Sequence, residues 1–177
     1  MDVSRRRPVG IIGSSTAAPG TPAYDTARAV AHGLAKRGIP ILCGGRGGVM
    51  EAACLGAEEG GGLSLALLPG MDPDAANPHA SIVLTTDLGK AQDPIVRTPI
   101  EISRNRVIAS ASACLVAVSG GVGTANEIGF ALAMGKTVIG LCDPPALEPD
   151  AASKGRMIAV ADVEAALAAV HTVLDLA

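Results

Sequence analysis

Apolar, β-branched runs alternate along the chain with alanine-rich stretches of helical periodicity. The runs expected to form strands are residues 8–13, 40–43, 63–68, 81–84, 114–118 and 137–141. The stretches expected to form helices are residues 22–36, 49–59, about 98–112, 124–134 and 162–174. Because the strands are almost continuously apolar, both faces of their sheet must be covered. The sequence therefore predicts an α/β protein with a three-layer, doubly wound Rossmann-like fold and a mainly parallel sheet of six to seven strands.

The length and composition indicate how this fold is filled. The 177 residues are expected to form a single Rossmann-like domain, residues 1–177. Tyr24 and Phe130 are the only aromatic residues, so Ala, Val, Leu and Ile must build the core. We therefore expect close packing of helices on the sheet through small residues.

Charge and cysteine usage exclude several classes of function. The net charge is -3 and the basic residues cluster only at Arg5-Arg6-Arg7, which predicts no nucleic-acid partner. The apolar stretch that follows is too short for a signal peptide or a membrane span, so we expect a cytoplasmic protein without a membrane partner.

The four cysteines, Cys43, Cys54, Cys114 and Cys142, form no CxxC pair and have no histidine at ligand spacing, which favours buried free thiols and no metal site.

Small, amide-rich turns follow three of the predicted strands. Because the carboxyl ends of parallel strands share one edge of a sheet, these turns should converge on a ligand. Glycine amides beside helix N-termini favour an anion, above all a phosphate, although glycines also serve simply to permit tight turns. The predicted binding residues are Gly13, Ser14, Ser15, Gly44, Gly45, Arg46, Gly47, Gly48, Gly120, Gly121, Val122, Gly123 and Thr124.

The usual nucleotide fingerprints do not fit these turns. The segment 44–50 lacks the Lys-Ser/Thr of a P-loop, and the segment 121–126 lacks the third glycine of GxGxxG. The sequence supports neither ATP hydrolysis nor ordinary dinucleotide binding.

Glu127 has two interpretations. Thr124 and Glu127 have the spacing of a capping box, in which the Thr124 side chain caps a backbone N–H and the Glu127 carboxylate reaches back to the N–H of Thr124 itself. A carboxylate beside a glycine turn would also border a bound phosphosugar. Arg104 and Arg106, one residue apart in a helical stretch, cannot face the same way, so we expect one in solvent and the other at the site.

These residues resemble the Lonely Guy (LOG)-like Rossmann superfamily, once mislabelled lysine decarboxylases. Its loop Pro-Gly-Gly-x-Gly-Thr-x-x-Glu matches residues 119–127 except at Ser119, and Arg104 lies at the family arginine's distance upstream. Residues 44–52 resemble its second motif, Gly-Gly-x-x-Gly-x-Met-x-x-Ala. A homo-oligomer, a dimer or tetramer, is implied by the resemblance. Lysine decarboxylation is not expected, because no lysine has a motif suited to pyridoxal phosphate.

Two branches of the superfamily are candidates. In LOG enzymes, which cleave the N-glycosidic bond of nucleoside 5′-monophosphates, the arginine precedes a lysine, whereas Arg104 precedes Asn105. Arg-Asn, Thr86-Asp87-Leu88-Gly89 and Asn77-Pro78 look more like the molybdenum cofactor carrier branch. Residues 90–103 are more than that branch usually has at this place, which implies a different pocket lid.

The resemblance leaves two functions open. The first is a binding protein for a small phosphorylated heterocycle, a nucleoside monophosphate or the molybdenum cofactor, with no cofactor required for its fold. The alternative is a phosphoribohydrolase in which Glu127 and Arg104 are catalytic: Glu127 activates water while Arg104 holds the phosphate or ribose.

Overall fold

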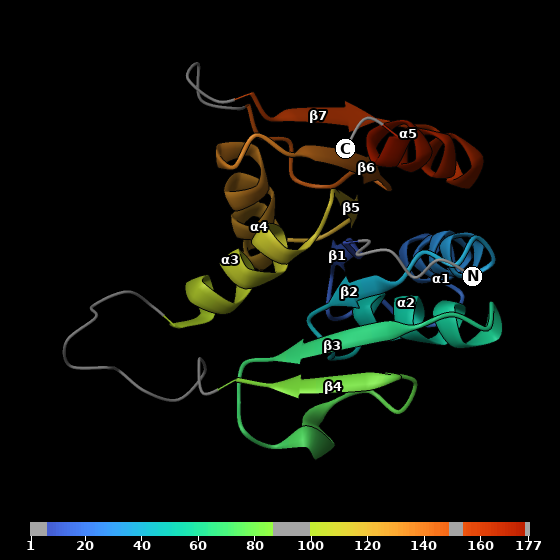
Figure 1. Ribbon diagram of the computed structural model, residues 1–177, viewed down its shortest axis with the longest axis vertical. Helices are drawn as coiled ribbons and strands as arrows, with labels where there is room; N and C mark the ends of the chain where they lie inside the picture. The colour runs from blue at the N-terminus through green and yellow to red at the C-terminus, as the bar shows by residue number, and fades with distance from the viewer. Residues whose placement is uncertain (1–6, 87–99, 149–153, 176–177) are drawn as a thin grey trace.

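The computed structural model describes residues 7–86, 100–148 and 154–175, with side chains from Arg104 onward in the second range. Strands and helices alternate as predicted (Figure 1). The strands are β1 Val9–Gly13, β2 Ile41–Cys43, β3 Ser64–Leu68, β4 Ile82–Thr85, β5 Leu115–Val118, β6 Thr137–Leu141 and β7 Arg156–Ala159. The helices are α1 Pro22–Ala35, α2 Val49–Glu59, the 3-10 turn η1 Pro73–Ala75, α3 Ile100–Ala111, α4 Val122–Ala133 and α5 Val163–Asp175.

All seven strands pair in parallel, in the order β4-β3-β2-β1-β5-β6-β7. The predicted parallel, doubly wound sheet is confirmed. The strand order reverses at β1, which pairs with β2 on one side and with β5 on the other. The crossovers from these strands therefore diverge at the carboxyl end of β1, where ligands of such folds bind.

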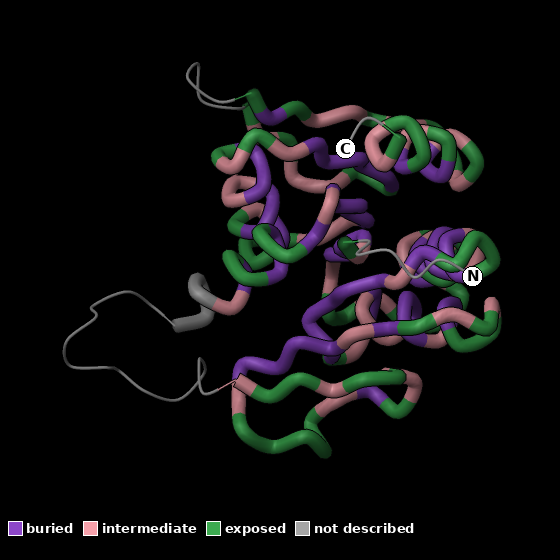
Figure 2. The backbone as a smooth tube through the Cα atoms, viewed as in Figure 1, coloured by how far each residue is buried: buried purple, intermediate pink, exposed green. Residues whose placement is uncertain are grey.

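Two apolar clusters cover the two faces of the sheet. Helices α1, α2 and α5 pack on one face, and α3 and α4 pack on the other (Figure 1). Buried residues concentrate in the central strands β1, β2, β5 and β6, whereas the edge strands β4 and β7 are mostly exposed or half-buried (Figure 2). The central strands are buried on both faces, which is why they read as continuous apolar runs.

Local signals at the ends of α1 act as their sequence suggests. Thr21 caps the helix by accepting a hydrogen bond from the Tyr24 amide at 3.4 Å, and Pro22 occupies the first helical position. Gly38, at φ 68°, turns the chain into β2 because glycine tolerates the left-handed conformation.

Some predictions need correction. Strand β7 is not among the predicted strands; this short edge strand has only four residues and a weak apolar pattern. The turn η1 lies between the predicted strands 63–68 and 81–84, where no helix is predicted. Cys43, Cys54 and Cys114 are buried free thiols as expected, but Cys142 is exposed. Residues 87–99, which include most of the segment 90–103, lie outside the described residues.

Within the described part of the chain, no helix has the length and apolar character required to cross a bilayer.

Candidate functional site

A cavity of about 420 Å³ lies at the carboxyl ends of β1, β2 and β5. Turns after all three strands contribute to its wall, together with α3 and α4. The lining residues are Ile11, Ile12, Gly13, Ser14, Ser15, Gly44, Arg46, Met50, Arg104, Asn105, Gly121, Val122, Gly123, Thr124 and Glu127. The predicted convergence of the three turns at one edge of the sheet is therefore observed.

Two glycines lie where a side chain would collide. A Cβ at Gly13 would stand 2.2 Å from the Val118 carbonyl oxygen, and one at Gly44 would stand 2.1 Å from Arg104 Nη1. Gly13 therefore allows β1 and β5 to approach, and Gly44 leaves room for the Arg104 guanidinium directly against the turn after β2. Because Gly44 has no side chain, the Arg104 guanidinium can lie at the wall of the cavity.

Four predicted binding residues, Gly45, Gly47, Gly48 and Gly120, do not line the cavity. Gly45, Gly48 and Gly120 have φ of 75°, 69° and 127°. A Cβ at Gly48 would stand 2.3 Å from the Ser14 carbonyl oxygen, which accepts a hydrogen bond from the Val49 amide. These three glycines shape the turns and bring their backbones together, while neighbouring residues face the cavity.

Helix α4 begins two residues earlier than predicted, at Val122, with Gly121 as its N-cap and no side-chain cap. Thr124 is thus inside the first turn, and the predicted capping box with Glu127 is wrong: the carboxylate lies more than a turn from the cap residue. The first-turn amides of Val122, Gly123 and Thr124 have no carbonyl partner within the helix. The helix N-terminus therefore presents free donors to the cavity.

Glu127 lines the cavity but has only 7% of its surface exposed. Burial raises the pKa of its carboxyl group to about 7, and the charge of Arg104 lowers it in part. Arg104 lines the same cavity, whereas Arg106 is exposed, so the two arginines face different environments as expected. The site contains a carboxyl group that changes its protonation state near neutral pH, beside a permanent cation.

Ser119, which stands where the resembled family has proline, adopts φ 56°. Proline cannot take this conformation because its ring holds φ near -65°. The turn between β5 and α4 therefore requires a residue other than proline at position 119.

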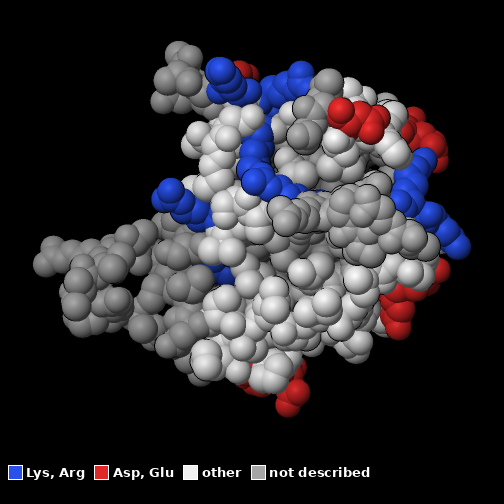
Figure 3. Space-filling view, in the orientation of Figure 1, with Lys and Arg blue, Asp and Glu red and all other residues white. Residues whose placement is uncertain are grey.

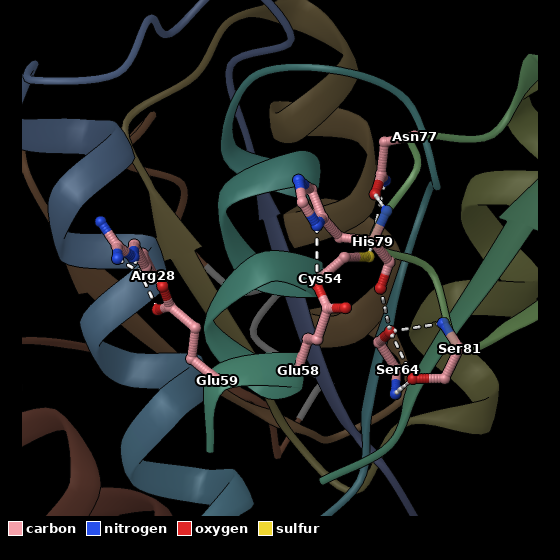
Figure 4. Close-up of polar contacts among 8 residues, drawn as sticks. All are labelled: Arg28, Cys54, Glu58, Glu59, Ser64, Asn77, His79 and Ser81. Atoms are coloured by element: carbon pink, nitrogen blue, oxygen red, sulfur yellow. Dashed lines mark hydrogen bonds and ion pairs between the residues drawn. The ribbon is translucent and has the colours of Figure 1, made fainter. Parts of the chain in front are cut away.

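Asn77 anchors the turn after β2. Its Nδ2 donates to the carbonyl oxygens of Gly45 and Arg46 at 3.1 and 3.2 Å and lies 3.5 Å from Cys54 Sγ, and its backbone amide donates to the Gly45 carbonyl at 2.8 Å. Figure 4 shows the Asn77 amide beside Cys54, next to His79, whose Nδ1 lies 2.7 Å from Glu58 Oε2. The segment between β3 and β4, which contains Asn77, thus supports the glycine turn from outside.

Sequence reasoning missed four lining residues: Ile11, Ile12, Met50 and Asn105. Met50 occurs in the quoted glycine motif and Asn105 follows the predicted arginine. Both could therefore have been predicted from the motifs. The two isoleucines lie in the apolar run predicted as the strand 8–13, a pattern that indicates a buried strand and not a binding site, and their side chains do pack in the two apolar clusters.

The charged groups of the site do not form a metal centre. No group of three or more His, Cys, Asp or Glu side chains within the described ranges is arranged to hold a metal ion. On the face drawn in Figure 3, acidic and basic side chains form small groups, some of them side by side, and much of the described surface carries no charged side chain. The donors of the cavity are suited to an anionic organic ligand.

The fold and the cavity together define a Rossmann-like α/β protein with an amide-rich pocket at the switch point of its sheet. Residues 6–167 match the model of the SLOG cluster4 family, so the chain belongs to that family, a LOG-like family as its motifs predicted.

The similar proteins cover most of the chain. A protein of Archaeoglobus fulgidus is 38% identical over 140 residues, which are 79% of this chain and 83% of the relative. The molybdenum cofactor carrier protein of Chlamydomonas reinhardtii is 32% identical, with a TM-score of 0.76 over 97% of this chain and 99% of that protein. The molybdenum cofactor binding protein of Rippkaea orientalis is 25% identical, with a TM-score of 0.77 over 97% of this chain and 99% of that one.

Proposed function

We propose that this protein binds a small heterocyclic ligand through its phosphate group, in the manner of a carrier, the ligand being a nucleoside monophosphate or the molybdenum cofactor. The observation that carries the proposal is the shared cavity of three small-residue turns, the N-terminus of α4 and Arg104. Free amides and a guanidinium bind phosphate by charge-assisted hydrogen bonds. The two similar structures named for the molybdenum cofactor support this ligand class.

The residues present fit the organic part of such a cofactor. The amides of Gly121, Val122 and Gly123 and the Arg104 side chain suit its phosphate. The side chains of Met50 and Val122, which line the cavity and are not buried, offer an apolar surface to its ring. In the described residues no cluster of side chains is placed to ligate the metal directly. The protein's part would therefore be to hold the phosphate and enclose the ring.

Binding is tested with a matched pair of arginine variants. Isothermal titration with AMP, and the molybdenum and phosphorus content of protein purified from a molybdate-supplied host, would be compared among wild type, Arg104→Met and Arg106→Met. We expect Arg104→Met to weaken binding about tenfold or more, because it removes a charge-assisted contact. Arg106 is exposed on the same helix and its substitution should leave binding unchanged. Equal affinities for all three proteins would contradict the assignment of Arg104.

The alternative function is hydrolysis of nucleoside 5′-monophosphates, and Glu127 favours it. A carboxyl group with a pKa of about 7 inside a cavity, beside Arg104, is suited to act as a general base toward water. The carboxylate would take a proton from the water that attacks the anomeric carbon, while the base leaves with the bonding electrons. Such a rate would rise with pH through about 7 as the carboxylate forms.

One assay distinguishes the binding function from the hydrolase function. AMP and related monophosphates are incubated with wild type and Glu127→Gln, and free base and ribose 5-phosphate are followed. Turnover that the substitution abolishes would exclude a pure binder. Tight binding of AMP by the wild type with no turnover would exclude the hydrolase.

A further inference from the structure

Asn105 is a polar residue in an apolar position. Helix α3 turns Asn105, Ile108 and Ala109 toward the protein interior, at the spacing of one helical face, and Ser112 just after the helix is buried on the same side. Asn105 is 6% exposed, and Ile108 and Ala109 beside it are fully buried. An aliphatic residue at this place would continue the cluster between α3, α4 and the sheet.

The Asn105 side chain also has an unmet hydrogen-bonding need. Within the described residues, its Oδ1 is buried and has no hydrogen-bond partner. Two other buried polar side chains are satisfied: Ser112 Oγ donates to the Ile108 carbonyl at 2.8 Å, and Asn77 Nδ2 donates to two carbonyls. A buried unsatisfied carbonyl is unfavourable, and native structures contain few of them. Fold stability therefore gives no reason for an amide at this position.

The location of Asn105 supplies a reason. It lines the cavity together with the glycine turns, Arg104 and Glu127. Oδ1 is an acceptor and a fully ionised phosphate offers only acceptor oxygens, so the complementary group is an N–H or O–H elsewhere on the ligand. The amides and Arg104 serve the phosphate, and Asn105 serves another part of the same molecule.

We infer that Asn105 is a specificity residue, which accepts a hydrogen bond from a donor on the uncharged part of the ligand. This inference rests on the proposed function and adds to it a preference among phosphorylated ligands. For a nucleotide the donor is either the amino group of the base or a ribose hydroxyl. A site that pairs a buried polar group with a ligand donor discriminates strongly against analogues that lack the donor, because the protein group is then left unpaired.

Four probes test the inference by titration against wild type and Asn105→Leu: AMP; purine ribonucleoside 5′-monophosphate, which lacks the amino group; 2′,3′-dideoxy-AMP, which lacks both free ribose hydroxyls; and ribose 5-phosphate. In the wild type, the probe without the donor should bind about tenfold or more weakly than AMP. Loss with the purine analogue identifies the amino group, and loss with 2′,3′-dideoxy-AMP identifies a ribose hydroxyl. In Asn105→Leu that difference should disappear. If the donor is the amino group, which ribose 5-phosphate lacks, the affinity for ribose 5-phosphate should be the same in wild type and Asn105→Leu.

The thermal midpoint of the same variant separates a binding role from a structural one. Because leucine removes an unpaired carbonyl from an apolar cluster, Asn105→Leu should melt at the wild-type temperature or above it. A lower midpoint, or an equal loss of affinity for all four probes, would overturn the inference and leave the proposed function intact. If ribose 5-phosphate binds but the other three probes bind the wild type with one affinity, the inference alone fails. If none of the four binds, the proposed nucleotide ligand fails and the inference fails with it.

Discussion

The carboxyl group of Glu127 experiences two opposing effects. Burial disfavours its charged form and raises its pKa, and the nearby Arg104 favours the charged form and lowers it. The resulting pKa of about 7, against 4.5 for an ordinary glutamate, means that burial is the larger effect. Compared with water, the cavity therefore favours the protonated form of Glu127 over the carboxylate. Ionisation of Glu127 consequently destabilises the folded protein.

The stability of the protein should fall between pH 4.5 and 7 through this residue. Because the folded state binds the Glu127 proton more tightly than the unfolded state, the contribution is fully present below the unfolded pKa and is lost as pH rises through the folded one. The shift corresponds to about 3 kcal/mol at most. Urea unfolding at pH 5 and pH 8 would measure it.

Glu127→Gln is the control, since the amide does not titrate. As pH rises from 5 to 8, the unfolding free energy of the wild type should fall relative to that of Glu127→Gln. A difference that is the same at both pH values would show that the carboxyl group keeps its ordinary pKa.

At the scale of elements, α3 is held by a residue outside it. Lys136, between α4 and β6, donates from Nζ to the carbonyl oxygens of Ala109 and Ser110 at 2.6 and 2.7 Å, and also to that of Ser112. These carbonyls belong to the last turn of α3 and the residue after it, where the helix lacks its own donors. Since α3 carries Arg104 and Asn105, the same ammonium group secures the helix that forms one wall of the cavity.

Lys136→Met should destabilise the fold by about 1–2 kcal/mol, because it leaves partly buried carbonyls without donors. The matched control is Lys36→Met, which removes an exposed lysine and should change the unfolding free energy by less than about 0.5 kcal/mol. Chemical unfolding of both variants checks the difference. Equal effects would mean that the α3 carbonyls do not depend on Lys136.

At the scale of the whole molecule, small residues set the distance between layers. A Cβ at Gly56 in α2 would stand 2.1 Å from the Arg28 carbonyl oxygen in α1, and one at Gly33 would stand 2.6 Å from Leu167 in α5. The three helices of this face thus approach one another at glycines. The alanine-rich, nearly aromatic-free composition is suited to such close packing.

Two glycines in helix interiors should respond oppositely to alanine. Gly56→Ala should lower stability by about 1–3 kcal/mol, since the methyl group meets backbone that cannot move alone. At Gly129 in α4 the nearest atom to an added Cβ is 3.9 Å away, so Gly129→Ala should be neutral or stabilise by about 0.5–1 kcal/mol. Thermal unfolding distinguishes them. A neutral Gly56→Ala would show that α1 and α2 can separate without cost.

Most of the fold could be predicted because its information is local. The apolar central strands, the Thr21 cap and Gly38 each depend on a few neighbouring residues. Strand β7 was missed because edge strands are only partly buried and carry a weak pattern. The start of α4 was also misplaced, since Thr124 has the spacing of a cap while the backbone turns into the helix at Gly121.

The turns of the site were predictable from one rule: each follows a strand of a parallel sheet, so all must meet at its carboxyl edge. Their glycines and the arginine upstream are visible in the sequence by itself, as is the family resemblance. What the tertiary structure decided is which side chains face the cavity and how deeply they lie. Three properties of the site arise from segments far apart in the chain. They are the burial that raises the pKa of Glu127, the contact of Arg104 with Gly44 and the buried Asn105 Oδ1, which has no hydrogen-bond partner among the described residues. Such properties depend on distance and exclusion of water, and spacing along a sequence contains neither.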